Sequence, residues 1–336
     1  MERVRADAKD VGNPAIEARA LTALSEVALL RNSDVDEARR LAQAALETVD
    51  PEDHTGRFDA LDVLENTGRW TGNTGESERY ARDMLETARR SGRLDLESRA
   101  ATQLGSVRGF RGDPEGAAEL FAQARALAEK SGSNIALATV LLASGDLQAN
   151  QGNLAVAEAE LTQAVDLFTE YGNANGIGRA RLHLARAVWK LRDSKRAERL
   201  FRDAIAVLKP LEDRGTLCEA QRGLAELFLE RGNIDEAEKY ALHARETVGA
   251  QDITSLSSTA YTLGRVRAAQ GRDEEAEALL REAIERVEGA DRADFWREPL
   301  TALAQFLRER GREDEAAAVE GRAEERTRSE STAEIA

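Results

Sequence analysis

Residues 224–244 read LAELFLERGNIDEAEKYALHA, and this stretch decides the fold. Its turn begins at Gly232, because glycine readily takes the left-handed conformation that ends a helix. Asn233 follows, with a side chain suited to cap the exposed N–H groups of a new helix. Small residues stand five and twelve positions after the glycine, at Ala237 and Ala244. The stretch therefore predicts two helices that are joined by a tight turn and packed closely together.

The same turn recurs eight times along the chain at steps of 39 or 40 residues. Its first residues are Ser33 (after an extra Asn32), Gly72, Gly112, Gly152, Arg192, Gly232, Gly271 and Gly311. Such regular spacing indicates an array of repeats, each a unit of two helices. The capping position next to the turn holds Asp or Asn in six repeats, with Glu37, Glu76 and Glu236 placed as in a capping box. Arg272 and Arg312 replace the cap in the last two repeats, where we expect weaker caps.

Small residues mark the places where neighbouring helices approach each other. Alanine or a substitute stands five residues after the turn at Ala38, Ser77, Ala117, Ala157, Ala197, Ala237, Ala276 and Ala316. Before the turn, a leucine is usually followed by a small residue, as in Leu104–Gly105 and Leu263–Gly264. Large and small side chains can then interlock between helices.

Composition supports an all-α protein and excludes several functions. The 336 residues are 32% charged and 42% hydrophobic, with only 5 Pro and a net charge of −15. An acidic chain repels phosphate backbones, so we expect no nucleic-acid partner. The single cysteine, Cys218, excludes an intrachain disulfide, and we expect it to be a small buried hydrophobe. No apolar stretch is long enough to span a bilayer and the first ten residues do not form a signal peptide, so a cytoplasmic location is expected.

Leu-Gly before the turn, glycine at the turn and alanine five and twelve residues later resemble the tetratricopeptide repeat. The resemblance covers residues 14–326 and implies a right-handed superhelical solenoid of antiparallel helix pairs. The usual Trp near the repeat start is mostly replaced, and the closing Pro appears only near Pro210. Units of about forty residues are similar to those of LGN/Pins scaffolds and of MalT-like bacterial regulators. HEAT and armadillo repeats share this length, but their sequence marks are absent.

We expect one solenoid of eight repeats over residues 14–326, with boundaries near 53, 93, 133, 173, 213, 251 and 291. Residues 1–13 should form the leading helix of a partial repeat, so the chain is either a piece of a longer protein or opens with a natural capping helix. Residues 327–336 should form a disordered polar tail. Pro299 should make the first helix of the last repeat start late or kink.

Nothing in the sequence points to catalysis, a metal or a cofactor. The three histidines, His54, His183 and His243, lie in different repeats at different positions, and no phosphate-loop, HExxH or GxSxG pattern occurs. An enzyme would lack candidate residues, so we expect a protein that binds other molecules.

The resemblance implies that the first helix of each repeat lines a concave surface. A face at spacings of 3, 4 and 3 residues on these helices gathers four arginines and two aromatic residues in the middle and late repeats: Arg179, Arg186, Arg222, Arg265, Trp189 and Tyr261. Arginine pairs with carboxylates at two points, so we predict that this face holds an acidic segment or a carboxylate of a peptide. Alternatively, the arginines pair with Glu219, Glu226 and their neighbours, and Trp189 serves packing.

The predicted function is a non-catalytic scaffold that captures a protein or peptide segment in its groove. One alternative is the regulatory region of a bacterial signalling or transcriptional regulator whose effector domain is missing from this chain. A helical-repeat protein that reads nucleic acid would need a basic groove with regular polar pairs. The groove positions vary too much here for that reading.

Overall fold

The computed structural model describes residue 6 and residues 12–31, 34–211, 213–288, 290 and 293–333. Over these residues the chain is helical and contains no strand. The first helices of the pairs are α2 (Pro14–Leu30), α4 (His54–Trp70), α6 (Leu94–Phe110), α8 (Asn134–Asn150), α10 (Ala174–Lys190), α12 (Arg214–Glu230), α14 (Ile253–Ala269) and α16 (Ala293–Glu309). The second helices are α3 (Val35–Thr48), α5 (Thr74–Ser91), α7 (Pro114–Ser131), α9 (Leu154–Glu170), α11 (Ser194–Leu208), α13 (Ile234–Thr247), α15 (Asp273–Arg286) and α17 (Glu313–Ala333).

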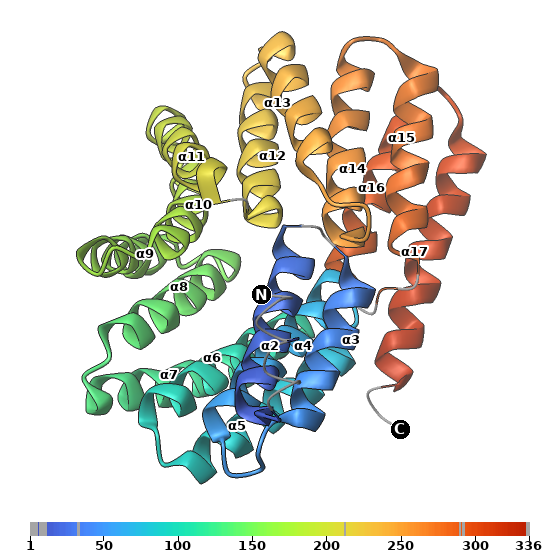
Figure 1. Ribbon diagram of the computed structural model, residues 1–336. Coiled ribbons are helices and arrows are strands. Elements are labelled where there is room, and N and C mark those ends of the chain that lie inside the picture. Colours follow the sequence, from blue (N-terminus) through green and yellow to red (C-terminus); the bar gives the residue numbers. More distant parts are fainter. Residues whose placement is uncertain are drawn as a thin grey trace.

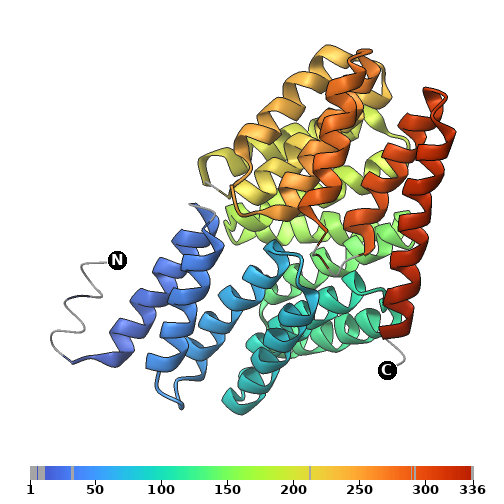
Figure 2. The same ribbon diagram turned by 90° about the vertical axis from the view of Figure 1, so that its right-hand side faces the viewer.

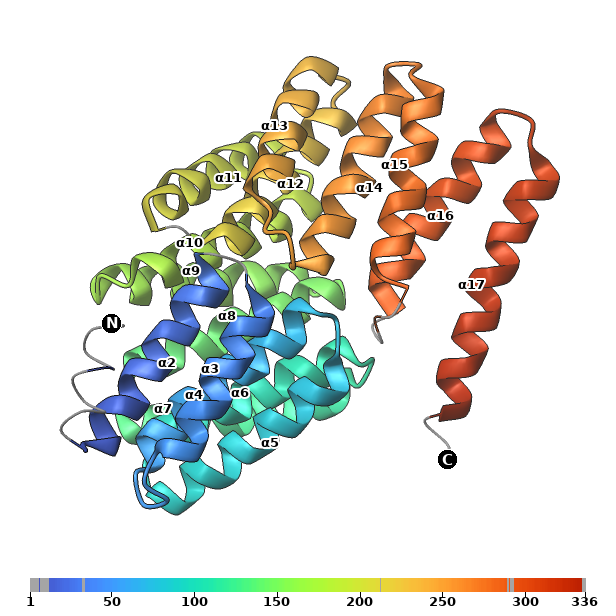
Figure 3. The same ribbon diagram turned by 45° about the vertical axis from the view of Figure 1, so that its right-hand side comes forward.

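The helices stack in sequence order as a solenoid. Each first helix packs against the second helix of its own pair, and each second helix packs against the next pair. The pairs α12–α13, α14–α15 and α16–α17 lie side by side in Figure 3. In Figure 2, α16 and α17 form one edge of the molecule. The all-α solenoid of antiparallel helix pairs predicted from the sequence is confirmed.

The turns take the backbone conformation that the repeated glycines predicted. Gly72, Gly112 and Gly152 have φ of 68°, 85° and 84°. Arg192 occupies the same turn position and has φ 68°, which makes it the one non-glycine residue with positive φ among the described positions. An L-residue in this conformation is strained because its Cβ crowds the following carbonyl oxygen.

Replacing Arg192 by glycine should therefore stabilise the fold. Relief of the left-handed strain, about 1–2 kcal/mol, is partly offset by the greater freedom of glycine in the unfolded chain, so we expect a gain of about 0.5–1 kcal/mol. The ion pair of Arg192 with Glu230 is exposed and contributes little. Urea denaturation would measure the change. As the reverse control, Gly152→Ala should destabilise the chain, because alanine is strained at the positive φ of this turn. No atom lies within 4 Å of the added Cβ, so the change would measure the backbone strain alone.

Most helices begin at a side-chain cap, as expected. Asn73 and Asp193, for example, each accept a hydrogen bond from the backbone N–H three residues later, at 2.9 and 3.0 Å. Arg272 makes no such bond, in agreement with the weaker cap predicted there. In the expected capping box of α3, the N–H of the cap residue Asp34 donates to the Ala28 carbonyl, and the Glu37 side chain forms a salt bridge with Arg40. The Glu37 backbone N–H nevertheless binds the Asp34 cap.

The core consists of the small residues between helices and the large residues that fill the gaps beside them. The residues five positions after the turn, from Ala38 to Ala316, are 0% exposed. A Cβ added to Gly145 would lie 2.7 Å from Leu161, and one added to Gly105 would lie 2.7 Å from Phe121. Only glycine leaves room for these side chains, which confirms the interlocking of large and small residues.

The solenoid curves so strongly that its first helix pair contacts the loop between the sixth and seventh pairs (Figure 1). The Gln251 side chain, in the loop before α14, accepts the Val35 N–H at the start of α3 at 2.5 Å. Trp70, at the end of α4, reaches to within 3.6 Å of a Cβ placed on Gly215 in α12. These contacts join segments that lie far apart in the sequence and narrow the concave side.

The chain's ends differ in part from the sequence expectations. Helix α17 continues to Ala333, so residues 327–333 of the expected disordered tail are helical. Helix α16 runs through Pro299 from a start at Ala293, in register with the earlier pairs, so the expected late start is wrong. Most of the expected leading helix, residues 1–13, lies outside the described residues. The first helices of pairs two to eight begin one or two residues after the expected boundaries.

Candidate functional site

A long groove occupies the concave side of the solenoid. It has a volume of about 1880 Å³ and is lined by side chains from all eight first helices. The second helices contribute little, because they form the outer layer of the solenoid. The groove is therefore the place where the repeats present side chains together.

The predicted site residues separate into two groups. Arg179, Arg186, Trp189, Arg222 and Tyr261 line the groove. Arg265 is exposed and lies outside the groove lining, although it is one helical turn from Tyr261. The position of these side chains follows the 3, 4, 3 spacing on α10 and α12, and that spacing fails near the end of α14.

Two of the arginines already have carboxylate partners. Arg186 binds Glu219 at 2.7 Å across neighbouring repeats, and Arg222 binds Glu226 at 2.6 Å within α12. Burial alone would raise the pKa of Glu219, but Arg186 and Arg222 outweigh it and lower the pKa to about 2. The alternative expectation of ion pairing within the groove is thus correct for Arg186 and Arg222.

The aromatic residues of the predicted site are also engaged within the protein. Trp189 Nε1 donates to Glu230 at 2.6 Å, and its ring meets Phe201 edge-on at 6.4 Å. Tyr261 lies under the guanidinium of Arg265, 5.4 Å from ring centre to Cζ. Burial raises the pKa of the Tyr261 hydroxyl. Both residues nevertheless line the groove.

A histidine–aspartate pair extends this row of charges. His183 Nδ1 lies 2.7 Å from Asp146 Oδ1, and both residues line the groove. Burial would raise the pKa of Asp146, but His183, Arg186 and Lys190 lower it to about 2. Several polar and charged side chains on the groove wall from α8 to α12 are therefore already paired with one another.

Arg179 is the exception. It lines the groove from α10, yet among the described residues it forms no hydrogen bond or ion pair. Burial lowers its pKa, and the charge of Arg69 lowers it further. Its positive charge is consequently not balanced by a contacting partner.

The sequence reasoning missed Arg69 and Trp70, at the end of α4. Both line the groove, and Arg69 interacts electrostatically with Arg179 three helix pairs later. The same 3, 4, 3 face continued back to the second repeat gives Asp59, Asp62, Asn66 and Arg69. That extension would have found Arg69. The approach of α4 to α10 and α12 depends on the curvature of the whole solenoid, which one repeat does not specify.

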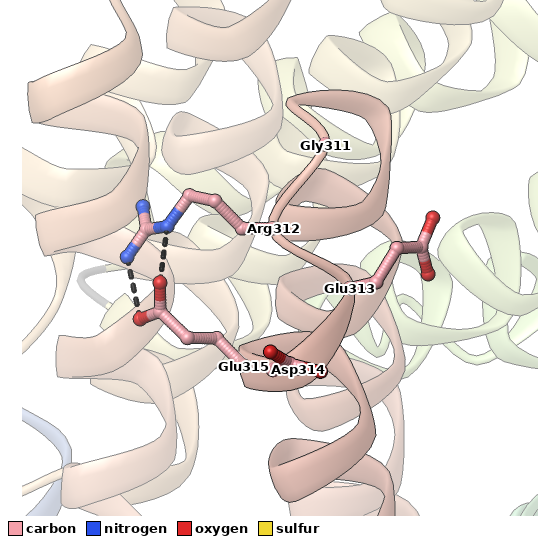
Figure 4. Close-up of a pocket in the computed structure, with 5 residues that line it drawn as sticks. All are labelled: Gly311, Arg312, Glu313, Asp314 and Glu315. Atoms are coloured by element: carbon pink, nitrogen blue, oxygen red, sulfur yellow. Dashed lines mark hydrogen bonds and ion pairs between the residues drawn. The ribbon is translucent and has the colours of Figure 1, made fainter.

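A small hollow at the turn between α16 and α17 has a different character (Figure 4). It is lined by Gly311, Arg312, Glu313, Asp314 and Glu315. The Arg312 guanidinium is bound by Glu315 at 2.7 Å and by Glu277 at 2.6 Å. Its donors are thus engaged, and the acidic side chains belong to the solvated first turn of α17.

Other candidate chemistry is not assembled in the described part of the chain. Cys218 is 1% exposed, and burial raises the pKa of its thiol, as expected for a packed hydrophobe. Over the described ranges no three His, Cys, Asp or Glu side chains are grouped to hold a metal ion. No helix within those ranges combines the length and the apolar character needed to cross a membrane.

Comparisons with known proteins agree with the repeat pattern. Two models of the tetratricopeptide repeat match the sequence, one over residues 27–83 and the other over residues 216–289. A search of curated proteins found no match. The narrower resemblance to LGN/Pins scaffolds or MalT-like regulators is not tested by these matches and stays a prediction.

Solved structures share the fold at low sequence identity. BtubC (BKLC) from P. vanneervenii is 20% identical with a TM-score of 0.50, and the match covers 66% of this chain and 91% of that one. A Rap protein complexed with Competence and Sporulation Factor is 14% identical with a TM-score of 0.54, covering 94% and 99%.

A third solved structure is a STAND protein, a signal transduction ATPase with numerous domains, from Pyrococcus horikoshii. It carries a tetratricopeptide repeat sensor, is 13% identical and has a TM-score of 0.55. The match covers 91% of this chain but 47% of that protein, so the chain spans about half of its length. The family matches show that the chain contains tetratricopeptide repeats, and the stacked helix pairs and the solved structures show that these repeats belong to one solenoid fold.

Proposed function

We propose that the chain is a non-catalytic interaction protein that binds an extended peptide or protein segment in its groove. Tetratricopeptide repeats in general bind proteins or peptides, and the groove gathers side chains from every first helix. The observation that carries the proposal is this groove of about 1880 Å³, whose walls combine charged side chains with Trp70, Trp189 and Tyr261. Aromatic and arginine side chains supply much of the binding energy at protein interfaces.

The similarity to the Rap protein supports an occupant of this kind. That protein is complexed with Competence and Sporulation Factor, and the two chains match over nearly their whole lengths. We propose that the occupant here is a peptide with an acidic or carboxylate-bearing segment. The proposed contacts are Arg179, Trp189 and Tyr261, with Arg186 and Arg222 holding the wall in place through their glutamates.

Filling the groove should abolish this binding. Peptides would first be selected from a displayed random library with the whole chain as bait, and their Kd measured by fluorescence anisotropy. Ser106→Trp and Ser258→Trp place large rings on the groove lining of α6 and α14. We expect each to weaken binding about tenfold or more, because the ring occupies the volume that the peptide needs.

The matched control is Gln163→Trp, which adds the same ring to an exposed position of α9 outside the groove lining. Circular dichroism would verify that all three variants keep their helix content. Equal affinity of the groove variants and the wild type, or an equal loss in the control, would contradict binding in the groove.

The likeness to the STAND protein favours a second candidate, a sensor region of a larger signalling protein. That protein carries a tetratricopeptide repeat sensor on a chain about twice the length of the matching part. Reading the DNA upstream for an in-frame effector domain would separate this candidate from a free-standing scaffold. The same groove would then receive the signal.

A further inference from the structure

We propose that Gln251 closes the solenoid as a clasp between the start of α3 and the loop before α14, and that release of this clasp opens the groove. Val35 of α3 and Gln251 are 216 positions apart in the sequence. Figure 1 shows the start of α3 beside the loop that leads into α14. The clasp itself follows from these contacts, whereas its control of access to the groove rests on the proposed function.

The Gln251 carboxamide acts as a second cap for α3. Its Oε1 accepts the Val35 N–H at 2.5 Å and the Asp36 N–H at 3.3 Å, and its Nε2 donates to Asp36 Oδ2 at 3.4 Å. The helix's own cap, Asp34, binds only the later N–H of Glu37. Gln251 therefore takes donors that the start of a helix otherwise leaves to water. These donors can return to water when Gln251 withdraws, so the contact is easily broken and remade.

The loop that carries Gln251 is held to its own helix pairs. The neighbouring Asp252 is 3% exposed, and its carboxylate accepts the Ser255 N–H at 3.0 Å. Arg214, at the start of α12, donates from Nε to the Thr247 carbonyl at 2.8 Å. The loop is thus fixed to the sixth and seventh pairs, and the clasp opens by separation from α3.

A second contact lies between the same parts of the solenoid. Trp70, at the end of α4, lies 3.6 Å from a Cβ placed on Gly215 of α12. Both residues line the groove, so separation at this contact widens the groove between the second and sixth pairs. The curvature of a solenoid accumulates from small rotations between repeats. Small changes in those rotations can therefore open the clasp without unfolding any helix.

Distances between spin labels across the clasp would test it. Gln43→Cys of α3 and Glu246→Cys of α13 provide exposed attachment sites, whereas Cys218 is 1% exposed and stays unlabelled. Electron paramagnetic resonance would measure the distance distribution in the whole chain. We expect mainly a short distance in the otherwise unchanged chain. Gln251→Ala should raise the ratio of long to short distances about tenfold, because it removes hydrogen bonds made only in the closed state.

A second variant opens the clasp without changing Gln251. Gly215→Leu adds a side chain where Trp70 packs, so it should also shift the distances to longer values. Gly321→Leu is its matched control, since no atom lies within 4 Å of the added Cβ. Gln163→Ala, at an exposed position of α9, is the control for Gln251→Ala. Both controls should leave the distances unchanged.

Stopped-flow fluorescence with the selected library peptide would then connect the clasp with the groove. Gln251→Ala should raise the association rate constant about fivefold to tenfold, because more chains are open when the peptide arrives. If neither Gln251→Ala nor Gly215→Leu changes the distances, the clasp is wrong, and the Ser106→Trp test of the groove is unaffected. Changed distances with an unchanged association rate would support the clasp and contradict its control of access. Changed distances in a chain that binds no peptide would support the clasp and overturn the proposed function.

Discussion

Phe201→Ala should destabilise the solenoid by about 3–5 kcal/mol, the usual cost of removing a fully buried phenyl ring. Phe201, on α11, is 0% exposed. Its ring contacts Trp189 of α10 edge-on and fills the space left by Gly223 of α12. It therefore joins three consecutive helices, and its loss would weaken both the fifth pair and its interface with the sixth.

The loss should remain local, because each repeat of a solenoid contacts mainly its neighbours. Hydrogen exchange should accelerate first in α10–α12, whereas urea denaturation would report the overall change. Tyr171→Ala is the aromatic control, since Tyr171 is 51% exposed and its removal leaves no cavity. Uniform acceleration of exchange along the whole chain would contradict the local response.

A double-mutant cycle can verify the contact itself. A Cβ on Gly223 would lie 2.5 Å from the Phe201 ring, so Gly223→Val alone should also be strongly destabilising. In the presence of Phe201→Ala, the added valine would occupy the vacated space. The double variant should then lose clearly less stability than the sum of the two single variants.

The sequence predicts the repeating part of this fold because each repeat contains the residues that determine its own turn, helix start and close packing. Gly232 and its counterparts specify the turn, Asn73 and Asp193 specify helix starts, and the alanine positions specify close packing. Arg192 illustrates the strength of the pattern, since it keeps the left-handed turn without a glycine. Pro299 was less informative, because α16 begins at Ala293 and continues through it.

The candidate site was only partly predictable. The residue spacing within each first helix correctly placed Arg179 and Arg186 of α10 and Arg222 of α12 in the groove. It could not decide which of them were neutralised, because the partner of Arg186 comes from another repeat and depends on side-chain geometry. The electrostatic effect of Arg69 on Arg179 depends on the accumulated rotation of three helix pairs. The small rotation from one repeat to the next is not specified by any single turn.

Glu65 gives the second large prediction, a stability that depends on pH. Its side chain is 0% exposed, and neither carboxylate oxygen has a hydrogen-bond partner. Burial raises its pKa from 4.5 to about 7, although Arg69 and, more weakly, Arg179 act in the opposite direction; Asp62 adds to the rise. The folded chain thus keeps a proton on Glu65 at pH values where the unfolded chain has released it.

The sign of the effect follows from this difference in proton binding. Between pH 4.5 and about 7 the folded state binds more protons, so stability falls as the pH rises. Below pH 4.5 the carboxyl of Glu65 is protonated in both states, so its ionisation does not affect the free energy of unfolding. Above pH 7 the charged carboxylate lowers the free energy of unfolding by about 3 kcal/mol, at about 1.4 kcal/mol per pKa unit. Glu65→Gln keeps the shape and removes the charge. It should therefore match the wild type near pH 4 and be about 3 kcal/mol more stable at pH 8.

Urea denaturation of both proteins from pH 4 to pH 8 would measure this difference, and other titrating groups cancel because both chains carry them. Glu170→Gln, at an exposed position of α9, controls for the substitution itself. A difference that stays constant with pH would show that Glu65 does not titrate in this range. A variant less stable than the wild type at pH 8 would show that the ion pair of Glu65 with Arg69 outweighs the cost of burying the carboxylate.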